Sequence, residues 1–217
     1  MSTNPGTAFC AQKTAPDRVV QRWGKSCLDY FGAGLLIVVL SPLLLVVGTL
    51  VVLESGWPLL HRRRVIGRSG EFYAFKFRTM RKDADTILAA DPILKAKFEQ
   101  NFKLKNDPRL TRVGSFLRKC SLDELPQFFN VLKGQMSLVG PRMITRAELE
   151  KYGESKELLL TVKPGITGYW QVNGRQEVSY DERIRMDMYY IENWSLWMDV
   201  KILLRTPLKV LQKQGAY

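Results

Sequence analysis

The hydrophobic pattern is dominated by one segment, Phe31 to Leu53, which contains no charged residue. It is longer than the roughly 20 residues with which an α-helix crosses the hydrocarbon core of a bilayer. Ser41 and Pro42 lie near its middle. There proline removes a backbone donor and clashes with the preceding turn, while serine can satisfy a freed backbone group. The segment predicts a membrane helix that is broken at Ser41-Pro42.

Both flanks of this segment are basic, which bears on how it sits in a membrane. The basic residues are Arg18, Arg22 and Lys25 on one side and Arg62, Arg63, Arg64 and Arg68 on the other. Positive residues favour the cytoplasmic side, so two basic flanks favour entry and exit through the same face. We predict a re-entrant helix-break-helix, and a kinked spanning helix is the alternative.

The rest of the chain divides around this membrane segment. Residues 1–17 are small and polar, with Pro5 and Pro16, and predict a flexible tail. They are not a signal peptide, because the apolar segment starts too late and is too long. Residues 18–56 form the interfacial and re-entrant unit, since basic and apolar positions mix before Phe31. Residues 57–217 remain as one domain at the cytoplasmic face.

A β-hairpin is predicted directly after the membrane unit. Gly67 to Gly70 is typical of a turn, and Glu71 to Arg78 alternates like a strand. The alternation places Lys76 and Arg78 side by side on one face, where they form either a binding site or an ordinary exposed strand face. Most of the basic cluster before the hairpin is interpreted as a solvated flank near anionic lipid.

Helical patterns dominate the remainder. Helices are expected over 80–104, 107–120 and 146–161, from the capping box at Ser179 to Asn193, and over 196–214. The last of these is amphipathic and suits a membrane interface. The predicted fold is therefore α/β, mostly helical and membrane-associated. It combines a re-entrant membrane helix with a compact core that has a short β-hairpin and interfacial amphipathic helices.

Composition narrows the functional classes. The formal net charge of +12 calls for an anionic partner: nucleic acid, an anionic lipid surface or a phosphorylated substrate. The three cysteines are too widely spaced for a disulfide framework or a zinc site. His61 is the only histidine, which argues strongly against Ser-His-Asp and HExxH mechanisms.

The strongest chemical signal is an acidic pair, Asp123 and Glu124, between two basic segments. Two carboxylates among arginines suit metal binding and phosphate chemistry. Ser121 and Glu124 also match a capping box, which would give the pair a purely structural role. Pro126 weakens that interpretation, because proline favours the first position of a helix. Both acids would then precede the helix with free side chains, beside its positive N-terminus.

Two loops supply further candidates for the same site. Gly140-Pro141-Arg142 is a rigid turn that presents an arginine, the residue suited to bidentate phosphate contacts. Residues 163–175 are rich in glycine and aromatic residues. The glycines would allow a ligand to approach the backbone, with aromatic side chains stacking on a base and Arg175 meeting phosphate. An ordinary tight loop with inward aromatics is the alternative.

Several motifs together resemble one family. They are the apolar segment broken at Ser41-Pro42, KFRTM (76–80), LRKCSLDELPQFFNVLKGQMSLVGPR (117–142), KPGITGYWQVNGR (163–175) and DMYYIENWSLWMD (187–199). In these motifs the chain resembles the monotopic polyprenyl-phosphate phosphoglycosyl transferases, the bacterial sugar transferase family, over about Arg22 to Tyr217. The resemblance is greatest to undecaprenyl-phosphate galactose or glucose phosphotransferases that initiate exopolysaccharide, capsule or O-antigen synthesis.

The resemblance implies a reaction and a place. A sugar 1-phosphate would pass from a UDP-sugar to undecaprenyl phosphate at the cytoplasmic face of the bacterial inner membrane, with release of UMP. Asp123 would be the nucleophile and form an aspartyl-phosphosugar. Glu124 would help as metal partner or as base, and the acidic pair would hold Mg²⁺. The candidate phosphate-binding residues are Lys76, Arg78, Arg118, Arg142 and Arg175, and Asp187 would order the site or the metal.

Two positions depart from the family pattern. Met143 stands where the family has proline after Gly-Pro-Arg, and Val65 replaces a basic residue before Ile66-Gly67. A neighbouring arginine would have to take the place of the basic residue missing at Val65. None of the arginines in the basic cluster before the hairpin is assigned to the site. The resemblance implies anionic membrane lipids but no nucleic acid as partners, and it leaves a homodimer open. The rival functions are a nucleic-acid-binding protein and a non-catalytic basic membrane scaffold.

Overall fold

The computed structural model describes residues 15–101, 104, 107–174 and 178–211. Its elements are α1 (Ala15–Ser55), β1 (Leu60–Gly67), β2 (Gly70–Phe77), α2 (Ala84–Ala90), α3 (Pro92–Asn101), α4 (Arg112–Lys119), the 3-10 turn η1 (Leu122–Glu124), α5 (Gln127–Leu132), β3 (Ser137–Val139), α6 (Arg146–Leu149), η2 (Glu150–Ser155), α7 (Lys156–Leu160), β4 (Gly165–Thr167), α8 (Tyr169–Asn173), α9 (Tyr180–Glu192) and α10 (Leu196–Leu211). The fold is mostly helical with a short hairpin, as predicted.

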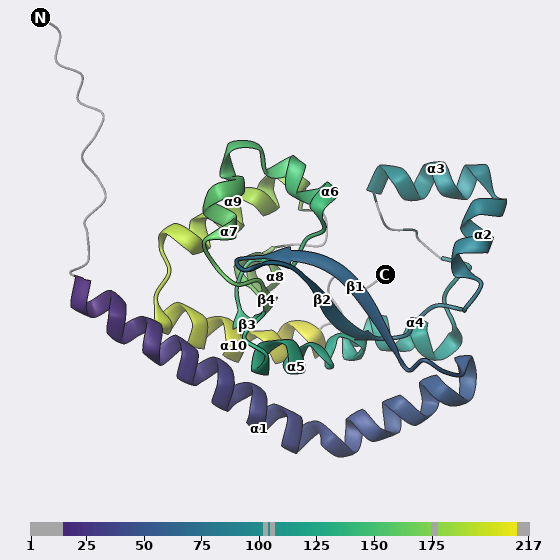
Figure 1. The fold of residues 1–217 in the computed structure, drawn as a ribbon, viewed down its shortest axis with the longest axis horizontal. Coiled ribbons are helices and arrows are strands. Elements are labelled where there is room, and N and C mark those ends of the chain that lie inside the picture. Colours follow the sequence, from purple (N-terminus) through teal and green to yellow (C-terminus); the bar gives the residue numbers. More distant parts are fainter. Residues whose placement is uncertain (1–14, 102–103, 105–106, 175–177, 212–217) are drawn as a thin grey trace, which may run out of the picture.

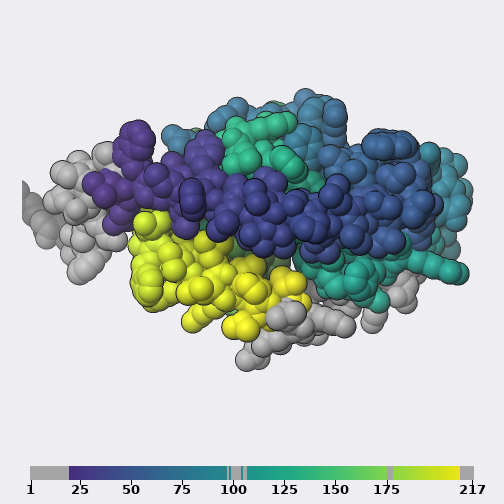
Figure 2. Space-filling model, turned by 90° about the horizontal axis from the view of Figure 1, so that it is seen from below, coloured from purple at the N-terminus to yellow at the C-terminus, as the bar shows by residue number. Residues whose placement is uncertain are grey.

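Helix α1 runs along one side of the core, beneath α5 and α10 (Figure 1). Seen from below it crosses the whole underside, with α10 beside it (Figure 2). Among the described residues it is the one helix that is long and apolar enough to cross a membrane, and most of its apolar part is exposed. An apolar helix left uncovered by the rest of the protein fits a lipid environment.

The predicted break at Ser41-Pro42 takes a different form. The helix continues without interruption from Ala15 to Ser55, and Pro42 lies inside it. Pro42 has no N–H for the carbonyl of Val38, four residues earlier, and the Ser41 hydroxyl donates to that carbonyl at 2.8 Å. The prediction that serine satisfies the backbone group freed by the proline is therefore confirmed. Figure 1 shows α1 bent near the middle of its length, as expected for a proline inside a helix. The re-entrant topology stays a prediction.

The N-terminal half of α1 is fastened to the core by buried charges. Lys25 Nζ lies 2.8 Å from Asp199 Oδ2 on α10 and donates to the Val139 carbonyl at 2.7 Å. The other Asp199 oxygen accepts from the Tyr190 hydroxyl at 2.7 Å. Asp29, one turn after Lys25, accepts from the Leu138 backbone at 2.9 Å. Each of these charges therefore has close partners, and the network holds α1 against β3 and α10.

Strands β1 and β2 form the predicted hairpin, and a second, parallel pair joins β3 to β4. The main core lies between the hairpin, α5, β3 and α10, and contains Ala33 of α1. A smaller cluster packs the C-terminal half of α1 against Phe77 and Leu117. A third lies under α7 and α9. The second cluster packs both the hairpin and α4 against α1, so two elements that carry basic residues, β2 and α4, lie close to each other.

Candidate active site

The acidic pair lies in η1, between α4 and α5. Ser121, just before it, adopts a left-handed backbone conformation with φ 55° and ψ 20°, which is uncommon for a residue with a side chain. The Ser121 side chain makes no capping hydrogen bond, so the alternative capping box is not formed. Helix α5 begins at Gln127, one residue after Pro126. Both carboxylates therefore precede the helix, as predicted.

Glu124 is held by cations from two other elements. Lys76 of β2 donates to Glu124 Oε1 at 2.5 Å, and Arg142 Nη2 lies 3.8 Å from the same oxygen. Burial opposes ionisation of Glu124, but Lys76, Arg142 and Arg63 outweigh it and lower the pKa of Glu124 to about 2. This side chain is therefore a permanent anion at neutral pH.

Asp123 is adjacent in sequence but behaves in the opposite way. It is buried, and burial together with the neighbouring Glu124 charge raises the pKa of Asp123 to about 6 against the opposing effect of Lys76, Arg118 and Arg142. Within the part of the chain that the structure describes, its carboxylate has no hydrogen bond or ion pair. A carboxylate that lies near cations without being bound to one keeps its lone pairs for another reaction partner.

The other phosphate-binding candidates divide into groups. Arg118 lies near Asp123 and donates from Nε to Thr79 Oγ1 at 3.0 Å. Arg78 instead donates to the carbonyls of Ser55 and Gly56 at the end of α1, both at 3.4 Å. Arg175 lies outside the described residues. The structure thus brings Lys76, Arg118 and Arg142 to the acidic pair, while a phosphate contact by Arg78 stays a prediction.

Arg142 is positioned by close packing between two loops. The Gly165 nitrogen donates to the Pro141 carbonyl at 2.8 Å, and the Gly140 nitrogen donates to the Thr167 carbonyl at 2.9 Å. A Cβ atom on Gly165 would lie 2.1 Å from the Gly140 nitrogen, so only glycine fits there. The glycines at 165 and 168 were predicted to let a ligand approach; they let the turn before Arg142 approach instead.

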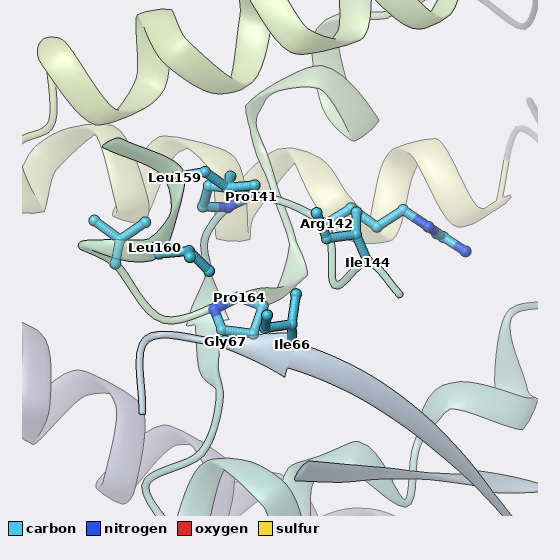
Figure 3. A pocket seen from close by; sticks show the side chains of 9 residues that line it. Ile66, Gly67, Pro141, Arg142, Ile144, Leu159, Leu160 and Pro164 are labelled. Atoms are coloured by element: carbon cyan, nitrogen blue, oxygen red, sulfur yellow. The ribbon is translucent and has the colours of Figure 1, made fainter. Parts of the chain in front are cut away.

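A small apolar pocket lies behind this turn. Its lining comes mainly from the β-hairpin end, the turn before Arg142 and α7: Ile66, Gly67, Pro141, Ile144, Leu159, Leu160, Val162 and Pro164, together with Arg142. Figure 3 shows the guanidinium of Arg142 extending away from the apolar lining. The apolar lining therefore packs against the backbone of the turn at Pro141-Arg142. The guanidinium of Arg142 points away from it, toward Glu124.

Asp187 is fully buried on α9, and Arg142 is a charged neighbour both of Asp187 and of the acidic pair. The Tyr152 hydroxyl donates to Asp187 Oδ2 at 2.9 Å, and Oδ1 has no partner among the described residues. Burial raises the pKa of Asp187 to about 6 despite Arg183, Tyr152 and Arg142. Its charged neighbours are thus arginines rather than Asp123 or Glu124. A role in ordering Arg142 fits this place better than a role at the metal, and both remain predictions.

The sequence interpretation missed Arg63 and His61. Both lie on β1, not in a solvated flank, and His61 faces Lys76 across the hairpin. Burial lowers the pKa of His61, and Arg63, Lys76, Arg118 and Arg78 lower it further, so this histidine sits among the cations of the site. Arg63 Nη2 lies 3.3 Å from Glu148 Oε2. The alternation of β1 was the signal that could have identified them.

The two departures from the family pattern have structural counterparts. Val65 is buried in the main core, where a charged side chain would lack solvent. Arg63 precedes it by two residues, so it lies on the same face of β1 and supplies positive charge near Glu124. Met143 is also buried in the main core, which fixes the chain after Arg142 without a proline.

Glu54 connects the site to the membrane helix. Its two carboxylate oxygens accept from the backbone nitrogens of Arg112 and Val113, at 2.8 and 3.0 Å. These are the first two residues of α4, whose unpaired N–H groups carry partial positive charge. Helix α4 carries Arg118, and Arg78 donates to the carbonyls of Ser55 and Gly56, next to Glu54. The end of α1 is therefore in contact with two elements that carry basic residues.

The donor set fits a magnesium ion that also binds substrate phosphate. No group of three or more His, Cys, Asp and Glu side chains that could hold a metal occurs among the described residues. Mg²⁺ commonly uses one or two carboxylates and completes its shell with phosphate oxygens and water. Asp123 and Glu124 offer two hard oxygen donors of this kind, although Lys76 already occupies one Glu124 oxygen.

Comparison with known proteins identifies the family. The family description "Bacterial sugar transferase" matches residues 20–213. The chain is 46% identical over 201 residues to the undecaprenyl-phosphate galactose phosphotransferase of Salmonella typhimurium, covering 90% of this chain and 42% of that protein. It is 41% identical over 214 residues to the exopolysaccharide production protein ExoY of Sinorhizobium fredii, covering 96% of this chain and 95% of that protein.

A third relative is the UDP-glucose:undecaprenyl-phosphate glucose-1-phosphate transferase of Xanthomonas campestris pv. campestris. The identity is 42% over 205 residues, which cover 89% of this chain and 40% of that protein. The chain thus spans less than half the length of the Salmonella and Xanthomonas relatives but almost the whole of ExoY. The match of the family over residues 20–213 shows that the chain belongs to the bacterial sugar transferases.

Proposed function

We propose that the protein transfers a sugar 1-phosphate from a UDP-sugar to undecaprenyl phosphate and releases UMP. The observation that carries the proposal is the contrast within the acidic pair. Glu124 is bound to Lys76, whereas Asp123 is buried near three cations without being bound to one. The printed names of the Salmonella and Xanthomonas relatives support undecaprenyl phosphate as acceptor. The printed name of the ExoY relative supports a place in exopolysaccharide production. The proposed location is the cytoplasmic face of the inner membrane, which the long apolar helix and its two basic flanks favour.

In the first step, an Asp123 oxygen attacks the β-phosphorus of the UDP-sugar. A new bond joins that oxygen to phosphorus, and the bond from the β-phosphorus to the bridging oxygen breaks. UMP leaves with the electron pair, and an aspartyl-phosphosugar remains. Lys76, Arg118 and Arg142 stabilise the charge on the phosphoryl oxygens. Asp123 must be ionised for this attack, and a pKa of about 6 leaves it ionised at neutral pH.

In the second step, an oxygen of undecaprenyl phosphate attacks the same phosphorus. The acyl phosphate bond breaks, Asp123 regains its carboxylate, and the product is undecaprenyl diphosphate sugar. A pKa of about 2 makes Glu124 a poor base, so its place beside Lys76 favours charge compensation over proton transfer. Mg²⁺ bound by Asp123, Glu124 and the diphosphate would supply further neutralisation of charge.

The test is UMP release from a panel of UDP-sugars with undecaprenyl phosphate and Mg²⁺, in detergent. One preferred sugar should give UMP in step with lipid-linked product. Asp123→Asn should give none, although it should unfold at the same temperature as the wild type or at a slightly higher one. Full UMP release by Asp123→Asn would refute the nucleophile. Absence of UMP with every sugar, in folded protein, would favour the non-catalytic membrane scaffold.

A further inference from the structure

A second cavity lies between α8 and α10, and its lining contains none of the residues around the acidic pair. Its volume is about 280 Å³. The lining residues are Tyr169, Asn173, Ser195, Trp197, Met198, Lys201, Ile202 and Arg205. Two of them are cations and none is acidic, so the cavity combines aromatic walls with uncompensated positive charge.

The outer face of α10 explains why the cavity is accessible from a membrane. Trp197, Leu204 and Leu208 are 63%, 69% and 60% exposed. Spacings of seven and four residues place all three on one strip of the helix. Lys201 and Arg205 follow at four-residue intervals from Trp197 and form one edge of this strip. The exposed apolar strip is therefore bordered by the two cations that line the cavity.

The two cations are held toward the cavity and not neutralised by their own helix. Arg205 Nη1 donates to Asn173 Oδ1 of α8 at 3.1 Å, and Lys201 Nζ lies 5.6 Å from the centre of the Trp197 ring. The acid of α10, Asp199, is fully buried and binds Lys25 and Tyr190 instead. Neither partner of Lys201 and Arg205 carries a charge that would compete with an anion.

The helix that carries the strip also lies beside the apolar membrane helix. Figure 2 shows α10 beside α1 on the underside of the molecule. A lipid that reached this edge would place its hydrocarbon chains on the apolar strip and its headgroup at the level of the cations. Lysine and arginine at the boundary of an apolar surface bind headgroup phosphates, and tryptophan favours the same depth.

We propose that the cavity between α8 and α10 binds the phosphodiester headgroup of a glycerophospholipid. Lys201 and Arg205 contact the phosphate, and the acyl chains lie along Trp197, Leu204 and Leu208. A lipid bound at a defined position would fix the angle at which α10 meets the membrane. The site is distinct from the acidic pair and does not depend on the proposed reaction.

The experiment is calorimetric titration of the full chain, in a maltoside detergent, with soluble dihexanoyl phosphatidylglycerol. Binding should be saturable, with one lipid per chain. The double variant Lys201→Gln/Arg205→Gln should weaken it about thirtyfold, since each basic residue near an anionic lipid contributes roughly a factor of five. Lys201→Arg/Arg205→Lys keeps both charges and should stay within about threefold of the wild type.

The matched control is Arg68→Gln/Lys95→Gln, which removes the same charge from the exposed hairpin turn and from α3. This control should leave lipid binding unchanged. If both double variants weaken binding equally, the lipid is attracted by the overall positive charge and not by a defined site, which would overturn the proposal. If inorganic phosphate binds as tightly as the lipid, the cavity is a site for free anions, and the proposal of a lipid site is wrong. Displacement of the phosphatidylglycerol by lower concentrations of geranyl phosphate would identify the cavity as an acceptor-lipid site, again against the proposal.

Discussion

Two clusters of buried charge in this molecule are built from the same residue types but differ in how they are paired. Around Lys25, Asp29 and Asp199, each charged group has close hydrogen-bonding partners. Around the acidic pair, Glu124 is bound to Lys76 while Asp123 has no hydrogen bond or ion pair among the described residues. Full pairing produces a structural connection, and incomplete pairing leaves a reactive group. The comparison separates the residues expected to govern stability from those expected to govern chemistry.

The largest expected effect lies in the incompletely paired cluster. Asp123→Asn should lower UMP release by about 10⁴-fold or more, because the amide cannot act as the nucleophile. Stability should stay constant or rise slightly, since burial disfavours the Asp123 charge in the folded protein. Initial rates and thermal unfolding in the same detergent measure both. A large loss of stability in Asp123→Asn would mean that Asp123 has a structural role, like the charges around Lys25.

Asp199→Asn makes the opposite prediction in the fully paired cluster. It removes the carboxylate 2.8 Å from the partly buried Lys25 and leaves Asp29, at 3.8 Å, as its remaining carboxylate, which should reduce the free energy of unfolding by about 2 kcal/mol. Turnover per folded molecule should change little, because Asp199 binds Lys25, Tyr190 and Trp194 and none of the residues of the acidic pair. Denaturant unfolding, compared with active-site titration, measures the two effects. A hundredfold loss of turnover in folded Asp199→Asn would contradict the conclusion that the fully paired cluster governs stability and not chemistry.

Lys76→Met tests whether the cations of the acidic pair act on both carboxylates. Lys76 lowers the pKa of Glu124 and opposes the rise at Asp123, so its removal should raise both. Turnover should fall by about 10²-fold, and the acidic limb of the pH profile should move to higher pH. Lys76→Arg, as the control, should keep the limb in place. An unchanged limb in Lys76→Met would mean that Lys76 does not influence ionisation of the nucleophile.

Ionisation of Asp123 should have opposite effects on activity and on stability as the pH rises. The pKa of Asp123 is raised to about 6, so turnover should increase from about pH 5 to 7 as the carboxylate ionises. A raised pKa means that the folded state binds the proton more tightly, so the contribution of Asp123 to stability should be lost as pH rises from about 4 to 6. Parallel rate and unfolding profiles, with Asp123→Asn as reference, test the sign. A wild-type stability profile identical to that of the variant would refute the shift.

The smallest effect concerns the connection between α1 and α4. Glu54→Gln should lose one of the two hydrogen bonds to the α4 backbone and lower the free energy of unfolding by about 1 kcal/mol. Turnover should fall only a few-fold through a small shift of Arg118 on α4. Glu54→Asp keeps the charge and is the matched control. If Gln and Asp behave alike in rate, Glu54 does not position Arg118.

Sequence alone predicted what depends on local pattern. The alternation of Glu71 to Arg78 and the glycines before it predicted the hairpin, and Pro126 correctly placed the acidic pair ahead of α5. What it missed depends on contacts between distant residues. Lys76 and Glu124 are 48 positions apart, Glu54 and Arg112 are 58 apart, and the packing of Gly165 on Gly140 is a tertiary contact. The alternation of β1 could have shown that His61 and Arg63 share one strand face, but the nearness of Arg63 to Glu124 and Glu148 is a tertiary contact that the sequence does not show.

The most direct test of the account is mass spectrometry of the protein after incubation with its preferred UDP-sugar and Mg²⁺, without undecaprenyl phosphate. The account predicts one sugar phosphate bound to the peptide that contains Asp123, with one UMP released per chain, and loss of this adduct when undecaprenyl phosphate is added. UMP release that requires undecaprenyl phosphate from the start, with no adduct on Asp123 in protein quenched during turnover, would contradict it.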